Sequence, residues 1–389
     1  MVVSEYNPLG KYQLRRYFYQ KAAANLLPIG GTFELTPRCN MNCCMCYIRM
    51  SESQMCQRGA ERTADEWIAL GKSCAEQGML FLLLTGGEPF LRPDFRQIYT
   101  ELKKLGLMIS INTNATLIDE RTVRWLSEDA PAKVSVTLYG GSNETYRQLC
   151  GHPTGFDAAT RAIDMMKQAG ILVHINSSFT RLNEGDMESI ISFAKSRDLT
   201  VSSTTYMFPP VRSAKQGETD DAVRFSPEEA GKAQARAEQL ILEPAQLKHR
   251  LKMLHTGCAD RMISEDGCDR SASEKMGCMA GKASFWVTWD GRMTPCGMMN
   301  APVAYPFDTG FAEAWQTITE ETDRLMLPAQ CSGCNMRSAC MVCGALCAAE
   351  SDGRTDERPQ YLCEQTRVYM DEMEKAYQQL IGGVSHEDR

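Results

Sequence analysis

Four cysteines lie within eight positions of the segment "RCNMNCCMC", residues 38–46. Three of them, Cys39, Cys43 and Cys46, follow a C-x3-C-x2-C spacing. A structural zinc site uses four ligands, usually in two pairs, and no second pair or suitably spaced histidine follows nearby. Three thiols on one loop suit a [4Fe–4S] cluster better, because they bind three irons and leave the fourth open to a small molecule. We therefore expect an iron–sulfur cluster with one open iron.

A second motif, "GGEP" at residues 86–89, directly follows the apolar run "MLFLLLT" at 79–85. Two glycines let main-chain amides come close to a ligand, and the Glu88 carboxylate can accept hydrogen bonds from an ammonium group. A Gly-Gly turn after a strand is weak evidence of a ligand site on its own. The evidence is stronger here because the three-cysteine loop follows the preceding strand, so the two loops should be neighbours.

More cysteines gather near the C-terminus, between residues 278 and 363. The stretch "FWVTWDGRMTPC", 285–296, alternates apolar and polar residues around an Asp-Gly pair, which predicts a β-hairpin that presents Cys296 beside Cys278. The rest of this region shows little helical periodicity and little apolar bulk, so metal sites should stabilise it. Because thiols are many and histidines few, iron–sulfur clusters fit this region better than zinc.

The elements that must position these residues follow from hydrophobic periodicity. Short apolar runs alternate with amphipathic segments, and in one of these Trp67, Leu70 and Cys74 share a helical face, while Asp119 is a candidate N-cap of another. Six apolar runs are predicted strands: 32–36, 79–85, 107–112, 133–139, 172–179 and 200–207. Strands alternating with helices indicate a parallel sheet, and six units are two short of a complete (β/α)8 barrel. We expect an α/β fold, a partial (β/α)6 TIM-like barrel.

The predicted organisation has five parts. They are an N-terminal helical segment (1–31), the partial barrel (32–208), a linker and helical segment (209–277), a cysteine-rich domain (278–370), and a C-terminal helix end with a disordered tail (371–389). In the first part, one helical face, made of Leu14, Tyr17, Phe18 and Ala22, should pack on the outside of the barrel. We expect the 31 residues before the first strand to be too few for a winged-helix domain.

Composition limits the functional classes. The chain has 389 residues, 43% of them hydrophobic, which can fill a sizeable core. Its net charge of −7 lacks the basic excess of a dedicated nucleic-acid binder. No run approaches the roughly 18 apolar residues of a membrane span, and the N-terminus is too polar for a signal peptide. We expect a cytoplasmic protein without membrane contact, whose 17 cysteines include metal ligands rather than disulfides.

Cys39, Cys43 and Cys46, together with "GGEP", resemble the signature of radical S-adenosylmethionine (radical SAM) enzymes, and the resemblance covers residues 32–208. It implies that the amino and carboxylate groups of SAM chelate the open iron. It also implies that an electron from the reduced cluster cleaves SAM to a 5′-deoxyadenosyl radical, which abstracts hydrogen from a substrate. Cys44, Cys56, Cys74 and Cys150 are then ordinary thiols.

The resemblance also implies SAM contacts outside the cluster loop's thiols. At the methionine end it implies Glu88 for the ammonium group, the Gly86 and Gly87 backbone, and Arg147 for the carboxylate. At the nucleoside end it implies Asn112 and Asn114 near the ribose, Ser135 in the same pocket, and Tyr47 at the adenine. As alternatives, the two asparagines close a turn and Arg147 is a solvated helix residue. Met45 departs from the family, which usually has an aromatic residue there, but methionine can still cover an adenine face.

The C-terminal cysteines resemble the SPASM extension of radical SAM enzymes, which carries two auxiliary [4Fe–4S] clusters. The resemblance implies a nearer cluster on Cys278, Cys296, Cys347 and one of Cys268 or Cys258. It implies an outer cluster on Cys331, Cys334, Cys340 and Cys363. The spacing departs from the family after Cys340, because Cys343 is surplus and could replace either neighbour.

The expected function is that of an oxidoreductase-type radical SAM enzyme that modifies a peptide or protein by hydrogen abstraction, with oxidation or cross-linking as the outcome. An external electron donor or acceptor of the flavodoxin or ferredoxin type is an expected partner. Sulfatase maturation is disfavoured, because those enzymes have aspartate where Gly297 follows Cys296. Alternatives are a small-molecule dehydrogenase or epimerase and a non-catalytic iron–sulfur redox protein, against which the intact cysteine motif and Glu88 argue.

Overall fold

A computed structural model describes residues 8–48, 50–210, 221–256 and 274–384. One eight-stranded sheet runs through it in the order β6-β5-β4-β3-β2-β1-β7-β8, and β1 to β6 pair in parallel. These six strands are β1 Gly30–Glu34, β2 Phe81–Thr85, β3 Met108–Thr113, β4 Lys133–Thr137, β5 Val173–Ser178 and β6 Thr200–Thr204. The six predicted strands and the partial-barrel fold are therefore confirmed.

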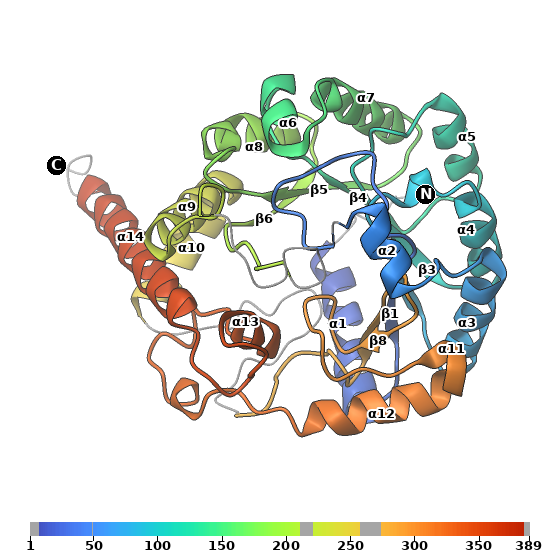
Figure 1. Ribbon diagram of the computed structural model, residues 1–389. Coiled ribbons are helices and arrows are strands. Elements are labelled where there is room, and N and C mark those ends of the chain that lie inside the picture. The colour runs from blue at the N-terminus through green and yellow to red at the C-terminus, as the bar shows by residue number, and fades with distance from the viewer. Residues whose placement is uncertain (1–7, 49, 211–220, 257–273, 385–389) are drawn as a thin grey trace, which may run out of the picture.

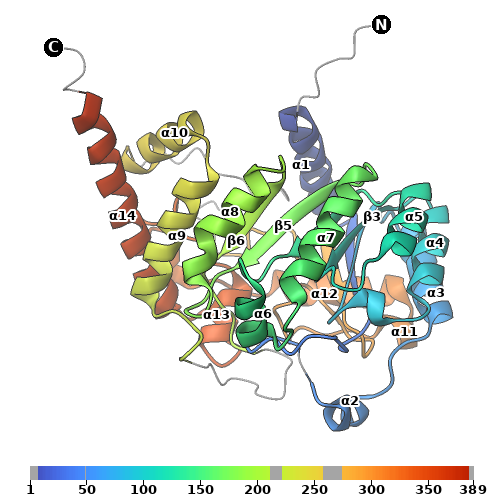
Figure 2. The same ribbon diagram turned by 90° about the horizontal axis from the view of Figure 1, so that it is seen from above.

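Helices cover the outer side of the curved sheet, as Figures 1 and 2 show. Those that connect successive strands in this layer are α3 Ala64–Glu76, α4 Phe95–Lys104, α5 Glu120–Glu128, α6 Asn143–Cys150, α7 Gly155–Gln168 and α8 Met187–Lys195. Helix α2 Glu52–Arg58 has no buried residue and lies apart from the layer, beyond one end of the barrel (Figure 2). The predicted face of α3 is buried, and the Asp119 side chain accepts a 2.7 Å hydrogen bond from the Thr122 amide at the start of α5. Local sequence signals thus position the outer layer.

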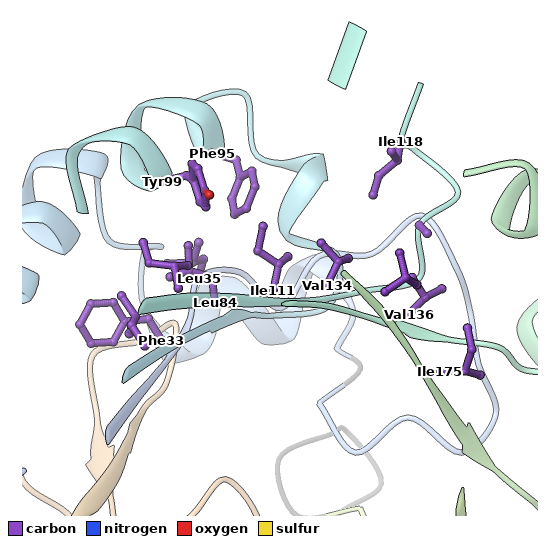
Figure 3. Packing of buried hydrophobic residues seen from close by; sticks show 14 of the residues in the cluster. Phe33, Leu35, Leu84, Phe95, Tyr99, Ile111, Ile118, Val134, Val136 and Ile175 are labelled. Atoms are coloured by element: carbon purple, nitrogen blue, oxygen red, sulfur yellow. The ribbon is translucent and has the colours of Figure 1, made fainter. Parts of the chain in front are cut away.

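The main core lies between the sheet and these helices. Alternate strand residues such as Leu84 and Ile111 are fully buried, and α4 contributes Phe95 and Tyr99 from above (Figure 3). Period-two burial is what a strand with one helix-covered face requires. The remaining strand residues consequently face the inside of the barrel.

The inner face of the barrel is polar towards β6. Ser135 of β4 pairs in register with His174 of β5, whose ring nitrogens hydrogen-bond to Thr200 at 2.6 Å and Ser202 at 2.9 Å. Both β6 residues are exposed, as is Thr204. Solvent therefore reaches uncharged hydrogen-bonding side chains on this side of the barrel.

The predicted hairpin forms and extends the barrel sheet. Strands β7 Ser284–Val287 and β8 Met293–Thr294 pair antiparallel, and β7 lies parallel to β1. Gly291 in the turn has a φ of +90°, which favours glycine over any residue with a side chain. The hairpin was expected inside a separate cysteine-rich domain, but its strand pairing makes it continuous with the barrel.

Helices are more frequent in the C-terminal region than its periodicity suggested. The structure has α11 Pro306–Thr309, α12 Phe311–Asp323, α13 Gly344–Glu350 and α14 Gln360–Val384. In α12, Phe311, Trp315, Ile318 and Thr322 are buried at helical spacing, so the expectation of little helical content was wrong there. Helix α14 continues to Val384, well into the predicted C-terminal helix end and tail (371–389), and residues 385–389 lie outside the described residues.

The segment between barrel and cysteine-rich region contains two helices, α9 Pro227–Ile241 and α10 Pro244–His255. One continuous helical stretch was predicted here. It breaks because Leu242 is extended and Pro244, at the start of α10, cannot donate a hydrogen bond to the preceding turn. Helix α14 packs along both α9 and α10.

Helix α1, Pro8–Ala24, packs with a different face from the one predicted. Ala22 is buried as expected, but Leu14, Tyr17 and Phe18 are exposed. Tyr19 is buried instead and stacks on Phe81 at 5.6 Å, because α1 lies at the start of β2, at the opposite end of the barrel from α2 (Figure 2). Among the described helices, none is long and apolar enough to cross a bilayer.

Candidate active site

The cysteine loop and the "GGEP" turn are in direct contact where β1 and β2 end. The Gly87 amide donates to the Thr36 carbonyl at 2.7 Å, and the Glu88 amide donates to the Arg38 carbonyl at 2.9 Å. A Cβ on Gly86 would lie 2.6 Å from the Thr36 oxygen, and one on Gly87 would lie 2.3 Å from the Arg38 oxygen. The two glycines are needed here because the backbones of the two loops touch.

The Glu88 carboxylate is fully buried between this turn and the end of β3. It accepts hydrogen bonds from the Thr113 hydroxyl at 2.8 Å, the Asn114 amide at 2.8 Å and the Phe90 amide at 3.1 Å. Burial raises the pKa of Glu88 to about 7, although the three hydrogen bonds favour the charged form. The side chain thus joins the loop after β2 to the end of β3.

Asn114 carries this connection on to the cysteine loop. Its side-chain nitrogen donates to Asn40 at 2.9 Å and reaches the Cys39 sulfur at 3.7 Å. Burial, together with the nearby charges of Glu88 and of the Cys43 and Cys46 thiolates, raises the pKa of Cys39 to about 12. Cys39, Cys43, Cys46 and Glu88 therefore lie in one site.

The middle of the cysteine loop rests on the C-terminal end of α6. The Asn42 amide donates to the Cys150 carbonyl at 2.7 Å, and the Cys44 amide donates to the Leu149 carbonyl at 3.0 Å. The Cys43 thiol lies close to the Cys150 thiol and to the Tyr139 hydroxyl. The hydrogen bond with Cys150, followed by burial, raises the pKa of Cys43 well above its usual value. Cys44 is exposed.

The remaining predicted SAM contacts fall into two groups. Asn112 and Ser135 face each other in the β3–β4 register on the inner side of the barrel, and Tyr47 is partly buried after Cys46. Arg147 lies on the outer surface of α6, where its side chain is 58% exposed and pairs with Glu144. The structure does not bring Arg147 together with the thiols.

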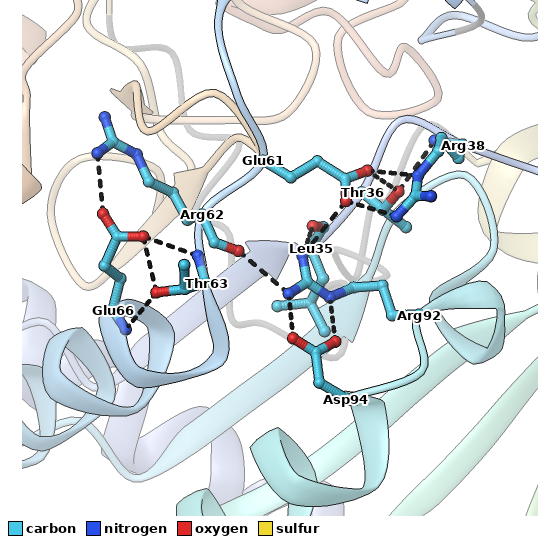
Figure 4. A network of polar contacts seen from close by, with 9 residues as sticks. All are labelled: Leu35, Thr36, Arg38, Glu61, Arg62, Thr63, Glu66, Arg92 and Asp94. Carbon is cyan, nitrogen blue, oxygen red and sulfur yellow. Dashed lines mark hydrogen bonds and ion pairs between the residues drawn. The ribbon is translucent and has the colours of Figure 1, made fainter.

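A buried arginine holds the beginning of the cysteine loop (Figure 4). Arg92 donates to the Leu35 carbonyl at 2.8 Å and the Arg62 carbonyl at 3.1 Å, and it pairs with Asp94 at 2.7 Å. Only the planar, forked guanidinium can reach these acceptors together. Arg92 therefore joins the end of β1 to the segment that enters α3.

Glu61, on the same segment, reaches the cysteine loop itself. Its carboxylate accepts hydrogen bonds from the Thr36 hydroxyl at 2.5 Å and from the Arg38 guanidinium at 2.9 and 2.7 Å. The next residue, Arg62, faces the other way and lies over the Phe307 ring at 4.7 Å, close to the β7–β8 turn. Residues 61 and 62 thus contact both the cysteine loop and the C-terminal region.

In the C-terminal region, the four thiols predicted for the outer cluster line one cavity. They are Cys331, Cys334, Cys340 and Cys363. Arg337 and Arg358 line the same cavity, and the Arg358 guanidinium donates to the Cys363 sulfur at 3.1 Å. Burial raises the pKa of Cys340, and burial together with the nearby thiolates raises that of Cys331.

The thiols predicted for the nearer cluster surround a small second hydrophobic cluster. Cys347 is fully buried in it, and Cys278, Cys296 and Cys343 pack against it. Burial, followed by the charge of Cys343, raises the pKa of Cys347. Cys258 and Cys268 lie outside the described residues.

Residues 33–194 match the Radical SAM superfamily. This part of the chain is a radical SAM domain. The chain is 24% identical over 342 residues to the AdoMet-dependent heme synthase of Methanosarcina barkeri. The aligned region covers 84% of this chain and 94% of the relative. The chain is also 22% identical over 288 residues to the sporulation killing factor maturation protein SkfB of Bacillus subtilis. That alignment covers 74% of this chain and 64% of SkfB.

The solved structure of anSMEcpe with bound AdoMet has the same fold as this radical SAM chain. The TM-score is 0.66 at 17% identity, and the match covers 92% of this chain and all of the other. The superfamily implies a [4Fe–4S] cluster and SAM, so this chain is a radical SAM enzyme.

The donor set of this radical SAM domain fits such a cluster. Among the described residues, no cysteine forms a disulfide. In the same parts of the chain, no three histidine, cysteine, aspartate or glutamate side chains converge as ligands of a single metal ion. Thiols that bind a cubane cluster hold separate irons and stay farther apart. Cysteine thiolates are the usual ligands of such a cluster, so the residue types of the loop fit it.

Four residues of the site were not anticipated from the sequence. Thr113 stands between the two asparagines that were singled out, and Tyr139 ends the fourth strand run, so position at the barrel rim could have indicated both. Arg92 and Cys150 gave no such signal. Their contacts depend on how the cysteine loop folds back, which periodicity does not encode.

Proposed function

We propose that Cys39, Cys43 and Cys46 hold the [4Fe–4S] cluster of this radical SAM enzyme and that its substrate is a peptide or protein. The contact between the cysteine loop and the Gly86–Glu88 turn supports the first part most strongly. When bound, the cluster and SAM supply a 5′-deoxyadenosyl radical, which abstracts a hydrogen atom from the substrate.

The chain's own residues would bind and orient SAM. Asn112 and Ser135, side by side on the inner face, offer hydrogen bonds to the ribose, and Tyr47 lies where the adenine is expected. The Gly86 and Gly87 backbone would line the methionine end, and Glu88 is the candidate for the ammonium group. Its three protein donors fix its orientation. Because Arg147 is on the outer surface, we assign the SAM carboxylate to the open iron alone.

Two auxiliary clusters complete the proposal. Cys331, Cys334, Cys340 and Cys363 would hold the outer one, which their shared cavity supports. Cys278, Cys296 and Cys347, with Cys268 or Cys258, would hold the nearer one, and Cys343 is an alternative ligand. Bound there, the clusters supply a path by which one electron leaves the substrate radical for an external carrier of the flavodoxin or ferredoxin type. Loss of that electron makes the overall reaction an oxidation or a cross-link.

A peptide substrate is supported by the open side of the barrel. Among the described residues, β6 pairs only with β5, so its other edge is free of strands. An extended peptide can add to such an edge through main-chain hydrogen bonds. Thr200, Ser202 and Thr204 are exposed on this strand. Their hydroxyls already bond to His174 or to the Tyr206 carbonyl, but a hydroxyl oxygen has two acceptor positions and can also accept from a peptide N–H. SkfB and the PqqA peptide cyclase of Rhizobium meliloti are relatives whose names denote peptide or protein maturation.

A second candidate substrate is a small molecule, as in the dehydrogenase alternative. The similarity to the AdoMet-dependent heme synthase favours it, because that match extends over 84% of this chain. A tetrapyrrole is then the class of small molecule to test. The two candidates require different occupants of the same barrel opening.

The deciding experiment follows hydrogen transfer. The anaerobically reconstituted enzyme is given SAM, a reductant and either deuterated peptides encoded beside its gene or deuterated tetrapyrrole precursors of heme. We expect deuterium in 5′-deoxyadenosine, together with a modified peptide. Transfer from the tetrapyrrole only would replace the peptide proposal with the second candidate.

A further inference from the structure

We infer that Arg337 and Arg358 raise the reduction potential of the proposed outer cluster above that of the SAM-binding cluster. The outer cluster is then the last electron acceptor on the path from the substrate radical. This inference rests on the proposed function of the cavity lined by Cys331, Cys334, Cys340 and Cys363. The family resemblance supplies the cysteines of that cavity but neither of the two arginines.

The charged side chains around the cavity suit an anion. Within the described parts of the chain, two arginines line the cavity and no carboxylate does. Apart from these and the four thiols, the lining side chains are apolar or, at Gln330, a neutral amide. Four thiolates outnumber the positive charge of a cubane, so a cluster bound here would be an anion. The two guanidinium groups offset that negative charge.

Arg358 contacts one of the proposed ligands directly. Its Nε donates to the Cys363 sulfur at 3.1 Å. The Cys363 amide donates to the carbonyl of Pro359, the residue after Arg358, at 3.1 Å, so the start of α14 holds the two side chains near each other. A guanidinium stays charged in proteins, and a charged donor makes a stronger hydrogen bond than a neutral one. Arg358 is therefore a permanent donor to this thiol.

Arg337 lines the same cavity from the turn between two of the other thiols. Its amide donates to the Cys334 carbonyl at 3.0 Å, and its Nη1 donates to the Val342 carbonyl at 3.4 Å. Its Nε is buried and, among the described residues, has no hydrogen-bond partner. A buried donor without an acceptor is destabilising, and a sulfur of a bound cluster would supply the acceptor.

The SAM-binding loop lacks such a charged donor at Cys39. The group that reaches the Cys39 sulfur is the neutral side-chain amide of Asn114, at 3.7 Å. The guanidinium of Arg38, on the same loop, is paired with the Glu61 carboxylate at 2.7 Å. A charged donor at the outer thiols and a neutral one at Cys39 together give the outer cluster the higher potential.

The direction of the effect follows from charge. Reduction adds one electron, and hence one negative charge, to a cluster and its thiolates. Positive side chains and hydrogen-bond donors stabilise this reduced form more than the oxidised form, so they raise the potential. The substrate radical loses the electron and releases one proton to solvent. The external carrier of the flavodoxin or ferredoxin type then takes the electron from the outer cluster, which returns to its oxidised form.

The test measures the potential of the outer cluster in the full-length, anaerobically reconstituted protein. Potentiometric titration is followed by electron paramagnetic resonance, using the signal that is absent from Cys334→Ala and does not respond to SAM. In Arg358→Gln we expect the ratio of reduced to oxidised outer cluster at the wild-type midpoint to fall about threefold, equivalent to about 30 mV for one electron. In the double variant with Arg337→Gln we expect about tenfold, or about 59 mV.

Arg354→Gln is the matched control. Arg354 is an exposed arginine on the same segment, where it pairs with Glu357, and it does not line the cavity. Its replacement should leave the potential of the outer cluster at the wild-type value. If Arg337→Gln fails to take up the outer cluster, Arg358→Gln, at an exposed position, decides alone.

Two results would overturn the inference and leave the proposed outer cluster in place. One is a wild-type potential in both single variants, with the Cys334-dependent signal retained. The other is a wild-type outer cluster whose potential lies below that of the SAM-responsive signal. Absence of any Cys334-dependent signal from the wild type would overturn the proposed outer cluster, and the inference with it.

Discussion

The carboxylate of Glu88 accepts a 2.8 Å hydrogen bond from the main-chain amide of Asn114, and the side chain of Asn114 reaches the Cys39 sulfur at 3.7 Å. Three segments, each at the end of a different strand, are thereby joined at one place. They are the cysteine loop after β1, the glycine turn after β2 and the end of β3. The order of the site depends on this connection.

Replacing Glu88 by glutamine should loosen the connection between the glycine turn and the end of β3. The two carboxylate oxygens each accept from a main-chain amide, one from Phe90 and one from Asn114. An amide side chain must point its NH2 at one of these donors, which leaves a buried N–H without an acceptor. We expect the free energy of unfolding to fall by about 1–3 kcal/mol in urea titrations, with weaker SAM binding. Glu144→Gln, at an exposed surface pair, is the control and should change stability by less than about 0.5 kcal/mol.

Arg92→Lys tests the clamp on the cysteine loop. Lysine keeps the charge but cannot contact the Leu35 and Arg62 carbonyls and Asp94 together. We expect the free energy of unfolding to fall by about 2 kcal/mol and proteolysis within residues 36–62 to become faster. Arg96→Lys, an exposed cation near Glu128, is the matched change elsewhere on the same connection. Equal protease sensitivity of the two variants would show that Arg92 does not hold the loop.

The sequence predicted the parts of this site that depend on strand order. The cysteine motif and "GGEP" follow consecutive parallel strands, so their meeting at one rim follows from topology alone. It also predicted all six barrel strands, because each is a short apolar run set between amphipathic helical segments. The pairing of β7 with β1 was not predictable in this way, since an edge pairing between distant segments leaves no local pattern.

Side-chain orientation was the less predictable part. Arg147 was a candidate from its place after the fourth strand, yet the start of α6 sets its helical phase and turns it outward, towards Glu144. In α1 a one-residue error in phase exchanged Phe18 for Tyr19 as the buried ring. Such errors arise because a helix rotates by about 100° per residue, so a small shift moves a side chain to another face.

Removal of Cys334 should reduce the iron content selectively. If three [4Fe–4S] clusters are present, the chain holds about twelve irons, and Cys334→Ala should retain about eight. SAM cleavage without substrate turnover should persist in this variant, while product formation falls. Cys56→Ala changes an exposed thiol of α2 and should keep the full iron content. Full iron content in Cys334→Ala would remove the outer cluster from the proposal.

His174 should make stability depend on pH. Burial, helped by the charge of Lys133, lowers the pKa of His174 to about 4 from 6.5. Between these values the unfolded chain binds a proton that the folded chain does not, so stability falls as the pH drops from about 6.5 to about 4. From pH 6.5 to 5 we expect a loss on the order of 2 kcal/mol in urea titrations. His174→Gln should abolish this part of the slope, and His255→Gln, at an exposed histidine, should not. An identical slope in all three proteins would contradict the burial-based account.

The most direct measurement is formation of 5′-deoxyadenosine from SAM by the anaerobically reconstituted protein after reduction with dithionite. We predict that the wild type and Cys44→Ala both form it and that Cys43→Ala, with the barrel still folded by circular dichroism, forms none. Cleavage of SAM by Cys43→Ala at the wild-type rate would contradict the assignment of the three-cysteine loop as the catalytic centre.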